Sequence, residues 1–298
     1  MVNVLSILKA AAVTPIMVSA DEHGIPYVDY GIRFGRQMGR VYNPLTVAIR
    51  GLQITGNDKL FGGLYLPMVA SAKTCDVRQI ADWLVAHEQS HGDWRCWYND
   101  FYWPTYRLVP PWRSALAEAL GGFFLLSVGD SFVNSRYRES GIGHLNALSV
   151  DTNKGGLRLI IKGGGSRFPE CTDYKNIEPP LILNGMLYAL LALHFSYLET
   201  GDPGLRMLYD SGIRQLRSDL HFFDGGYFTY YDSVGNPANQ AYHLTHVLLL
   251  SILVRISGDS VLNSYLARWS KMRSNYQLRE LVSHAQTTIL RGRLPYST

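Results

Sequence analysis

The chain interrupts its helical patterns four times with the same kind of turn. In each turn a glycine follows a run of apolar residues at helical spacing, and Asn or Asp follows the glycine directly. The four turns are Thr55-Gly56-Asn57-Asp58, Val128-Gly129-Asp130-Ser131, Thr200-Gly201-Asp202-Pro203 and Ser257-Gly258-Asp259-Ser260. Glycine readily adopts the left-handed conformation that ends a helix, and the polar residue after it can cap the next helix. Each turn therefore predicts a hairpin of two helices.

The recurrence of these turns predicts the fold class. Helical pairs repeated along a chain must pack on one another to bury their apolar faces. We therefore expect a mainly α protein, an (α/α) barrel or toroid of about four helical hairpins, with a stacked solenoid as the alternative. Asn43-Pro44 is expected to start one helix and Asp76 another, because both positions carry the residue types that begin helices.

Two long stretches between the hairpins break the helical pattern. Residues 155–180 alternate, pass a glycine triplet and reach Pro179-Pro180, while residues 222–237 are rich in Gly, Asp and Tyr. We expect short strands or β-hairpins there, and long loops inside a compact domain are often functional. Residues 1–40 are expected to be an extended segment packed on a main domain of residues 41–298.

Composition narrows the classes of partner. The net charge is +4, and no run of Lys or Arg indicates nucleic-acid binding, while a mildly basic surface favours an anionic glycan or peptide substrate. The three cysteines are too few and too scattered for a disulfide framework or a zinc site. Free thiols fit a reducing compartment, so we expect a cytoplasmic protein. The sequence leaves a homodimer open.

The N-terminus offers an alternative location. Met1–Ala20 is mostly apolar and ends in Val18-Ser19-Ala20, which resembles a signal-peptidase site. It lacks a basic beginning, and Lys9 and Pro15 interrupt the apolar run. Secretion by a cleaved signal is therefore the alternative to a cytoplasmic location. No later segment is apolar for long enough to predict a transmembrane helix.

The two loops concentrate carboxylates and tyrosines. The first contains Glu170, Asp173 and Tyr174, the second contains Tyr231, and Tyr242 opens the helical pattern that follows. Such side chains suit reactions at a sugar ring, where proton transfer is divided between two faces. The alternative is that the tyrosines end helices and the carboxylates bind loop amides.

A wider pattern resembles a known family. From Pro180 to Trp269 the sequence is similar to the C-terminal domain of the D-glucuronyl C5-epimerases, which convert glucuronate to iduronate in heparan-type chains. The similar stretches are residues 183–193, 199–202, 208–212, 231–232, 242–246 and 268–269, with 28–31, 43–48 and 112–117 upstream. The resemblance implies an (α/α) barrel and a metal-independent isomerase without a cofactor.

The resemblance also implies a mechanism and its residues. A base removes the proton from C5, beside the uronate carboxyl group, and an acid on the opposite face returns one. The catalytic positions of the family fall on Asp173, Tyr174, Tyr231 and Tyr242; Asp173 stands where the family has Glu, and Glu170 is the alternative. Six further residues of the similar stretches are expected to bind the substrate: Asn184, Tyr188, His243, His246, Trp112 and Tyr30.

One departure from the family leaves the substrate open. The family has Arg-Trp-Asp before its Tyr-His pair, whereas this chain has Asn239-Gln240-Ala241. An arginine there would be a natural partner for a carboxylate. The alternatives to a uronate epimerase are therefore an epimerase of an amino-acid residue in a peptide, a uronate lyase and a non-catalytic glycan-binding module.

One motif points to a different chemistry. His87-Glu88-Gln89-Ser90-His91 matches the H-E-x-x-H pattern, which binds zinc when both histidines share one face of a helix. Here the match runs directly into Gly92, and the sequence places no third ligand. We expect no metal site, with His87 and His91 as the only candidate ligands.

Overall fold

The computed structural model describes residues 17–33, 36–64, 66, 68, 73–175 and 179–272. Almost all of the signal-like stretch of residues 1–20 lies outside this part of the chain. The described α-helices are α2 (Pro44–Thr55), α3 (Val77–Ala86), α4 (Ala115–Ser131), α5 (Ser135–Ala147), α6 (Leu183–Thr200), α7 (Pro203–Asp219), α8 (Gln240–Ser257) and α9 (Ser260–Lys271).

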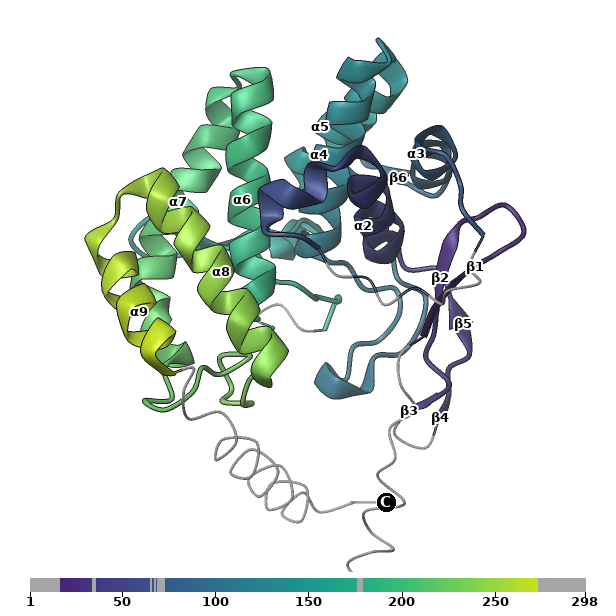
Figure 1. The fold of residues 1–298 in the computed structure, drawn as a ribbon. Helices are drawn as coiled ribbons and strands as arrows, with labels where there is room; N and C mark the ends of the chain where they lie inside the picture. The colour runs from purple at the N-terminus through teal and green to yellow at the C-terminus, as the bar shows by residue number, and fades with distance from the viewer. Residues whose placement is uncertain are drawn as a thin grey trace, which may run out of the picture.

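These helices pair into four consecutive hairpins, α2 with α3, α4 with α5, α6 with α7 and α8 with α9. One helix of each pair also packs on its counterpart in the next, α2 on α4, α4 on α6 and α6 on α8. The hairpins thus form an arc that runs from α2 and α3 on one side to α8 and α9 on the other (Figure 1). The prediction of a mainly α chain with four helical hairpins in an (α/α) toroid arrangement is confirmed.

The ends of the helices follow the local sequence with one exception. Asn43 and Asp76 cap α2 and α3, and Gly56, Gly201 and Gly258 take left-handed conformations after α2, α6 and α8. These helix ends are confirmed, but the tight turn predicted at Gly56 does not lead directly into the next α-helix: an uncapped 3-10 helix, Asn57–Phe61, follows it, and α3 begins at Val77.

The turn predicted at Gly129 is wrong. Helix α4 continues to Ser131, and the chain turns at residues 132–134, where Val133 has a φ of 51°. A Cβ at Gly129 would lie 2.6 Å from the amide nitrogen of Arg138, so this glycine allows α4 and α5 to pack closely. Close packing, and not a turn, is the physical reason for a glycine at this position.

Short strands occupy the connections. β1 (Met17–Ala20), β2 (Pro26–Asp29) and β5 (Arg40–Val41) form an antiparallel sheet in the order β1-β2-β5, and β3 (Ile32–Arg33) pairs with β4 (Arg36–Gln37). β6 (Gln89–Ser90) pairs with β7 (Arg95–Cys96), and β8 (Leu159–Ile161) with β9 (Gly165–Arg167). The short strands expected in residues 155–180 are confirmed by β8 and β9, whereas residues 222–237 form isolated bridges, such as Asp224 with Thr229, and no named strand.

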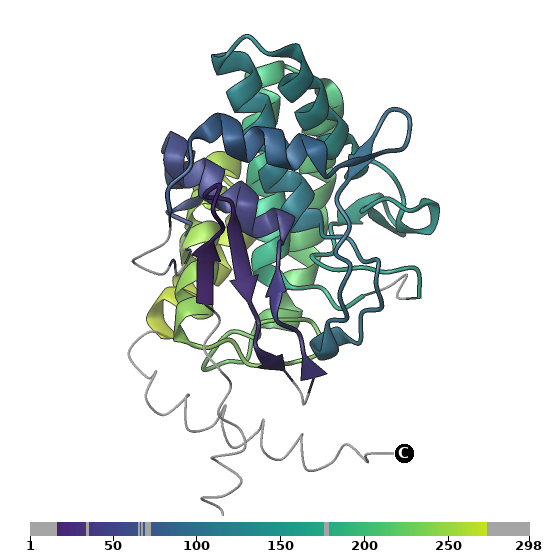
Figure 2. The ribbon, with the colours of Figure 1, turned by 90° about the vertical axis from the view of Figure 1, so that its right-hand side faces the viewer.

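The three-stranded sheet stands beside the helical arc, and β2 packs on α2 (Figure 2). Because β5 contains both Arg40 and Val41, a boundary between residues 40 and 41 cuts through a strand. The division into an N-terminal segment and a main domain stays a prediction.

The core lies between the hairpins. Helices α4 and α6 are buried around most of their circumference, and Phe123, Phe124, Leu187 and Leu190 are completely inaccessible. In the described part of the chain, no helix combines the length and the apolar character that crossing a bilayer requires.

Candidate active site

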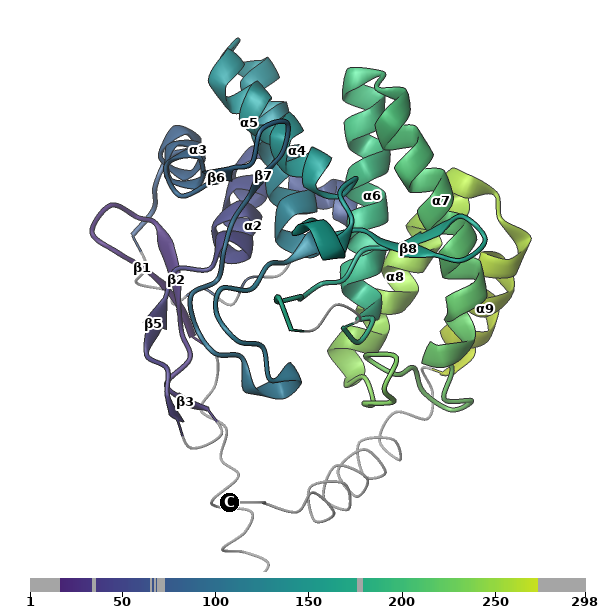
Figure 3. The same cartoon turned by 180° about the vertical axis from the view of Figure 1, so that it is seen from behind.

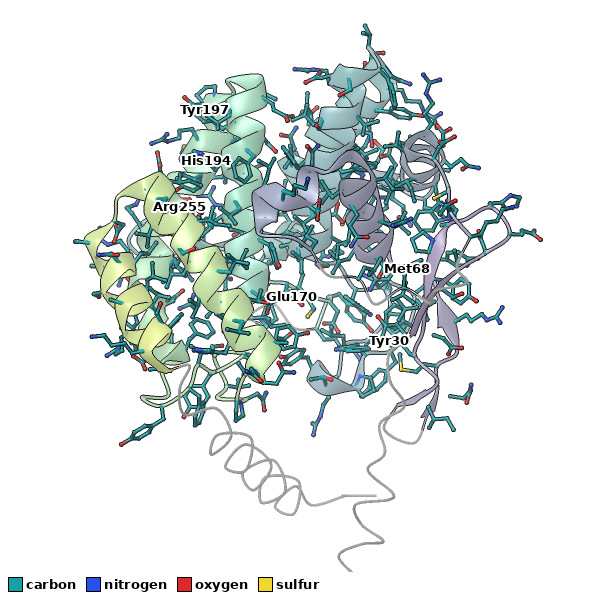
Figure 4. All side chains as sticks on the ribbon, viewed as in Figure 1. Tyr30, Met68, Glu170, His194, Tyr197 and Arg255 are labelled. Atoms are coloured by element: carbon teal, nitrogen blue, oxygen red, sulfur yellow. The ribbon has the colours of Figure 1, made fainter. Side chains whose placement is uncertain are left out.

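Glu170 occupies the N-terminal end of α6. The side-chain amide of Asn184 donates to Glu170 Oε2 at 3.3 Å, and the backbone amide of Gly185 donates to the same carboxyl group. Ile182, the residue before α6, provides no side-chain cap, so a carboxyl group from another segment takes that place. A Cβ at Gly185 would approach Glu170 Oε2 to 2.4 Å, which explains the glycine there. Figure 4 shows Glu170 near the middle of the molecule.

The environment of Glu170 changes its acidity. Burial raises its pKa to about 7, although the hydrogen bond from the Gly185 amide acts in the opposite direction. A carboxyl group with a pKa near neutrality can both take and return a proton under physiological conditions. Glu170 therefore has the properties of a general base or acid.

Three tyrosines surround Glu170, and we call Tyr188, Tyr231 and Tyr242 the tyrosine cluster. Burial and then the charge of Glu170 raise the pKa of each, to about 12 for Tyr188. The rings of Tyr231 and Tyr242 meet edge to face at a centroid distance of 4.6 Å, and a hydrogen bond from Tyr231 lowers the pKa of Tyr242. All three hydroxyl groups therefore carry their protons at neutral pH.

Main-chain pairing brings Tyr231 to α6. The amide of Leu183 donates to the carbonyl of Tyr231 at 3.1 Å, and Ile182 and Asp232 form an antiparallel bridge. Asp232 is fully buried and accepts the hydroxyl of Tyr106 at 2.7 Å. The sequence did not single out Tyr106, because no local pattern indicates which distant carboxylate a tyrosine will bind.

The other members of the site are held by helices. Tyr242 lies in the first turn of α8, where Asn239 caps the helix by accepting the Tyr242 amide at 2.9 Å. Asn184 and Tyr188 are one turn apart on α6 and so share a face. Tyr242 is 40% exposed, and its hydroxyl lies among the other tyrosines.

Aromatic residues join the N-terminal sheet to the site. The ring of Tyr30 packs on Phe101 and Trp103 at centroid distances of 5.6 and 5.3 Å, and Tyr30 also raises the pKa of Tyr242. Trp112 packs edge to face on Phe101 at 5.2 Å and donates its indole N–H to the Phe101 carbonyl at 2.7 Å. Tyr30 thus lies close enough to act on the tyrosine cluster, whereas the indole N–H of Trp112 is already bound.

Comparison with known proteins agrees with this arrangement of residues. The family model described as the D-glucuronyl C5-epimerase C-terminus matches residues 87–271, which contain Glu170 and the whole tyrosine cluster. The chain belongs to this family. The resemblance inferred from the sequence is confirmed.

Two curated relatives match the chain over only part of their own length. The D-glucuronyl C5-epimerase of Caenorhabditis elegans is 30% identical over 211 residues, which are 63% of this chain and 33% of the nematode protein. The uncharacterized protein MJ1128 of Methanocaldococcus jannaschii is 29% identical over 173 residues, 58% of this chain and 56% of that protein. The chain thus matches about half of one relative and a third of the other.

One solved structure matches part of the chain. The unsaturated glucuronyl hydrolase from Streptococcus agalactiae matches 76% of this chain and 56% of its own with a TM-score of 0.45 and 13% identity. Similarity at this level establishes neither a shared activity nor a shared substrate.

Two residues that the family pattern indicated lie elsewhere. Asp173 is 2% exposed and accepts the amides of Val109 and Lys175 at 2.7 and 2.8 Å, so it holds the loop together. Tyr174 is 66% exposed, and its ring lies 5.5 Å from the Lys175 ammonium group. The carboxyl group that joins the tyrosine cluster is Glu170, the alternative to Asp173. A family motif could not resolve this because both carboxylates lie on one irregular loop.

The two histidines that follow Tyr242 in the sequence, His243 and His246, are buried. His243 and His246 are both inaccessible, and the Nδ1 atoms of both lie within 3.1 Å of Thr229 Oγ1. Burial and the neighbouring His243 lower the pKa of His246 to about 3, so it is neutral. Their expected role in substrate binding stays a prediction, although both side chains are inaccessible in this structure. The reason is that both face the helical core, where the sequence pattern predicted the helix but not its buried face.

The H-E-x-x-H residues are separated because α3 ends before them. His87 stacks on Trp83 at 4.0 Å, whereas His91 stacks on Trp94 at 4.2 Å. Glu88 turns inward to His144 Nε2 at 3.1 Å. Within the described ranges, no three His, Cys, Asp or Glu side chains are placed to hold a metal ion. The helical arrangement that the motif requires is therefore not formed.

Proposed function

We propose that the chain is an isomerase that inverts a carbon-acid centre by proton abstraction and return. The most suitable centre is C5 of a uronic acid residue in a glycan, given the family to which the chain belongs. The observation that supports this most is a carboxyl group with a pKa of about 7, Glu170, held among three protonated tyrosines. The reaction needs a base and an acid, which a carboxyl group and a protonated tyrosine can provide.

Glu170 is the base in this proposal. Its carboxylate takes the proton from the carbon beside the substrate carboxyl group, and the electron pair of the broken C–H bond moves onto that group as an enediolate. Hydrogen-bond donors around the site, among them the amide of Asn184 and the hydroxyl of Tyr188, would stabilise the developing charge. Fixed donors in a water-poor site are most effective for this purpose.

Tyr242 is the acid. Its hydroxyl gives a proton to the opposite face of the carbon, and the electron pair of the enediolate forms the new C–H bond. The hydrogen bond from Tyr231 stabilises the tyrosinate that remains, because it lowers the pKa of Tyr242. Since Tyr242 is 40% exposed, water can return its proton and take the one held by Glu170. The cycle then closes without net loss of atoms or charge.

One observation favours a second candidate, an epimerase of an amino-acid residue in a peptide. The pKa of Glu170 is set by burial and by the Gly185 amide, and among the residues that the structure describes no cationic side chain contributes to it. A uronate carboxylate at this place would rely on neutral donors, whereas a peptide carbonyl needs no cation. The replacement of the family's arginine motif by Asn239-Gln240-Ala241 also favours a substrate without a carboxylate at this place.

Hydrogen exchange distinguishes these candidates. We would incubate the full chain in heavy water with a polysaccharide of alternating glucuronate and N-acetylglucosamine and follow the products by NMR. Deuterium at C5 is the expected result. An unsaturated-uronate absorbance would instead indicate a lyase, and exchange only at the α-carbon of a peptide would favour the second candidate. Binding with no exchange in any substrate would contradict an enzymatic function.

A further inference from the structure

A groove of about 420 Å³ lies between the β8–β9 hairpin and two segments that adjoin the candidate active site. One wall is the β8–β9 hairpin, which packs on α7 (Figure 3). The other wall is made by the residues just before α6 and by the loop that follows Tyr231. Its main lining residues are Ile160, Lys162, Arg167, Pro180, Ser233 and Val234.

Two paired segments connect this groove to the tyrosine cluster. The amide of Leu183 donates to the Tyr231 carbonyl at 3.1 Å, and the amide of Ser233 donates to the Leu181 carbonyl at 2.8 Å. Extended residues advance by about 3.3 Å each, so Ser233 lies about 7 Å along the chain from Tyr231. Tyr231 and Ser233 flank Asp232, which forms the bridge with Ile182. The groove and the tyrosine cluster are therefore joined through these two paired segments.

The hairpin brings positive charge to the groove. Residues 157–167 contain Arg158, Lys162 and Arg167 and no acidic residue. Arg167 is neutralised by two hydrogen bonds to Asp219, at 2.8 and 2.6 Å. The exposed Lys162 has no hydrogen-bond or ion-pair partner among the residues that the structure describes. Lys162 is therefore the uncompensated cation of the groove.

The remaining surface of the groove is apolar and held in place. Ile160 is 52% exposed and Val234 is 64% exposed, so both present apolar surface next to Lys162. The fully buried Asp232 accepts the amide of Val234 at 3.2 Å, which fixes the loop in the free protein. A preformed wall reduces the entropy lost on binding. Apolar side chains next to one cation match a sugar ring that carries a carboxylate.

We propose that this groove is a second subsite, which binds an acidic sugar of an anionic polysaccharide next to the residue that reacts at Glu170. The inference rests on the proposed function, because it requires a polymeric glycan at the active site. Lys162 binds the carboxylate of the acidic sugar, while Ile160 and Val234 contact the apolar faces of the chain. An extended acidic peptide is the competing occupant.

The test compares Lys162→Gln with Lys59→Gln in the full chain. Lys59 is an exposed lysine on the short 3-10 helix after α2, away from the groove, so it is a matched control for charge. We would measure KM and kcat for the glucuronate polysaccharide and for a short oligosaccharide that fills only the active site. Loss of one exposed charge contact is expected to raise KM for the polymer about fivefold. KM for the oligosaccharide, kcat and all values of Lys59→Gln should stay unchanged, and Lys162→Arg should restore binding.

Binding measured separately from turnover distinguishes failure of this subsite from failure of the proposed function. If C5 exchange occurs but Lys162→Gln leaves the polymer KM unchanged, the subsite is contradicted and the function stands. If no exchange occurs but calorimetry shows polysaccharide binding that depends on Lys162, the proposed function fails and the groove remains a binding site for the polysaccharide alone. If poly-glutamate binds with this dependence and the polysaccharide does not, the glycan assignment is overturned.

Discussion

The two ends of helix α6 are built in different ways. At the C-terminal end, Gly201 has a φ of 70° and its amide bonds to the Tyr197 carbonyl at 2.8 Å, while Asp202 accepts the Gly204 amide at 2.7 Å to start α7. Every group that forms this cap is a near neighbour in the sequence. At the N-terminal end, Ile182 provides no cap and Glu170 reaches in from the preceding loop.

The C-terminal cap of α6 therefore contributes to stability, whereas the N-terminal end also supplies a group for chemistry. A local cap satisfies the end of a helix without bringing a carboxyl group from a distant segment into it. Burial and the charge of Asp130 raise the pKa of the nearby Glu199 to about 7, but Glu199 is not part of this cap. A carboxyl group brought in from a distance is buried by the segments that carry it, and burial disfavours its charged form. The N-terminal end of α6 therefore combines a helix cap with a titratable group, an arrangement typical of active sites.

Removing the carboxyl group at the N-terminal end should have the largest effect. We expect Glu170→Gln to lower kcat for C5 exchange by a factor of about 10³, within the range for a lost general base. Glutamine keeps the size of the side chain, so the fold should be retained. Deuterium incorporation followed by NMR gives the rate.

The matched control lies at the opposite end of the same helix. Glu199→Gln removes a carboxyl group beside Gly201, and we expect the exchange rate to stay unchanged. If Glu170→Gln and Glu199→Gln lost the exchange rate equally, the N-terminal end of α6 would have no specific role in the reaction.

The tyrosines should differ in the size of their effects. We expect Tyr242→Phe to lower kcat by a factor of about 10², as for a lost general acid, and Tyr231→Phe by about tenfold. Tyr231 acts through Tyr242, because its hydrogen bond lowers the pKa of Tyr242. In Tyr231→Phe the alkaline limb of the pH–rate profile should therefore move to higher pH. A rate loss without that movement would mean that Tyr231 has only a structural role.

The buried carboxyl group should make stability depend on pH. The pKa of Glu170 is raised from 4.5 to about 7, so its contribution is fully present below pH 4.5 and is lost as the pH rises through 7. Relative to Glu170→Gln, the wild type should lose up to about 3 kcal/mol in its free energy of unfolding across this window. Denaturant unfolding of both proteins at pH 5 and pH 8 measures the difference. A constant difference between the two proteins would contradict a raised pKa.

The smallest effect is expected at the C-terminal end of α6. Gly201→Ala places a side chain in a left-handed conformation, which should lower the free energy of unfolding by about 1 kcal/mol. Space is not the cause, since nothing lies within 4 Å of a Cβ at this position. Thermal unfolding measures the loss, and the exchange rate should not change. A reduced exchange rate would show that the two ends are coupled.

The helical hairpins and most of their ends could be predicted from the sequence. Asn43, Asp76, Gly201 and Gly258 act on backbone groups only a few residues away, so their types are sufficient evidence. Gly129 has the same residue type but serves the contact of α4 with α5. A glycine at a turn and a glycine at a helix crossing are not distinguishable by local pattern.

In the candidate site, even more depends on the tertiary structure than in the helix ends. The sequence by itself determined the pairs of helices, the membership of the family and the set of tyrosines and carboxylates from which a site could form. Only the tertiary structure decided that Glu170, and not Asp173, lies against the first turn of α6, and that His243 and His246 are buried beneath Tyr242. The physical reason is the distance along the sequence over which the interactions act. Helix ends depend on hydrogen bonds between near neighbours, whereas burial and acidity depend on groups that meet only after folding.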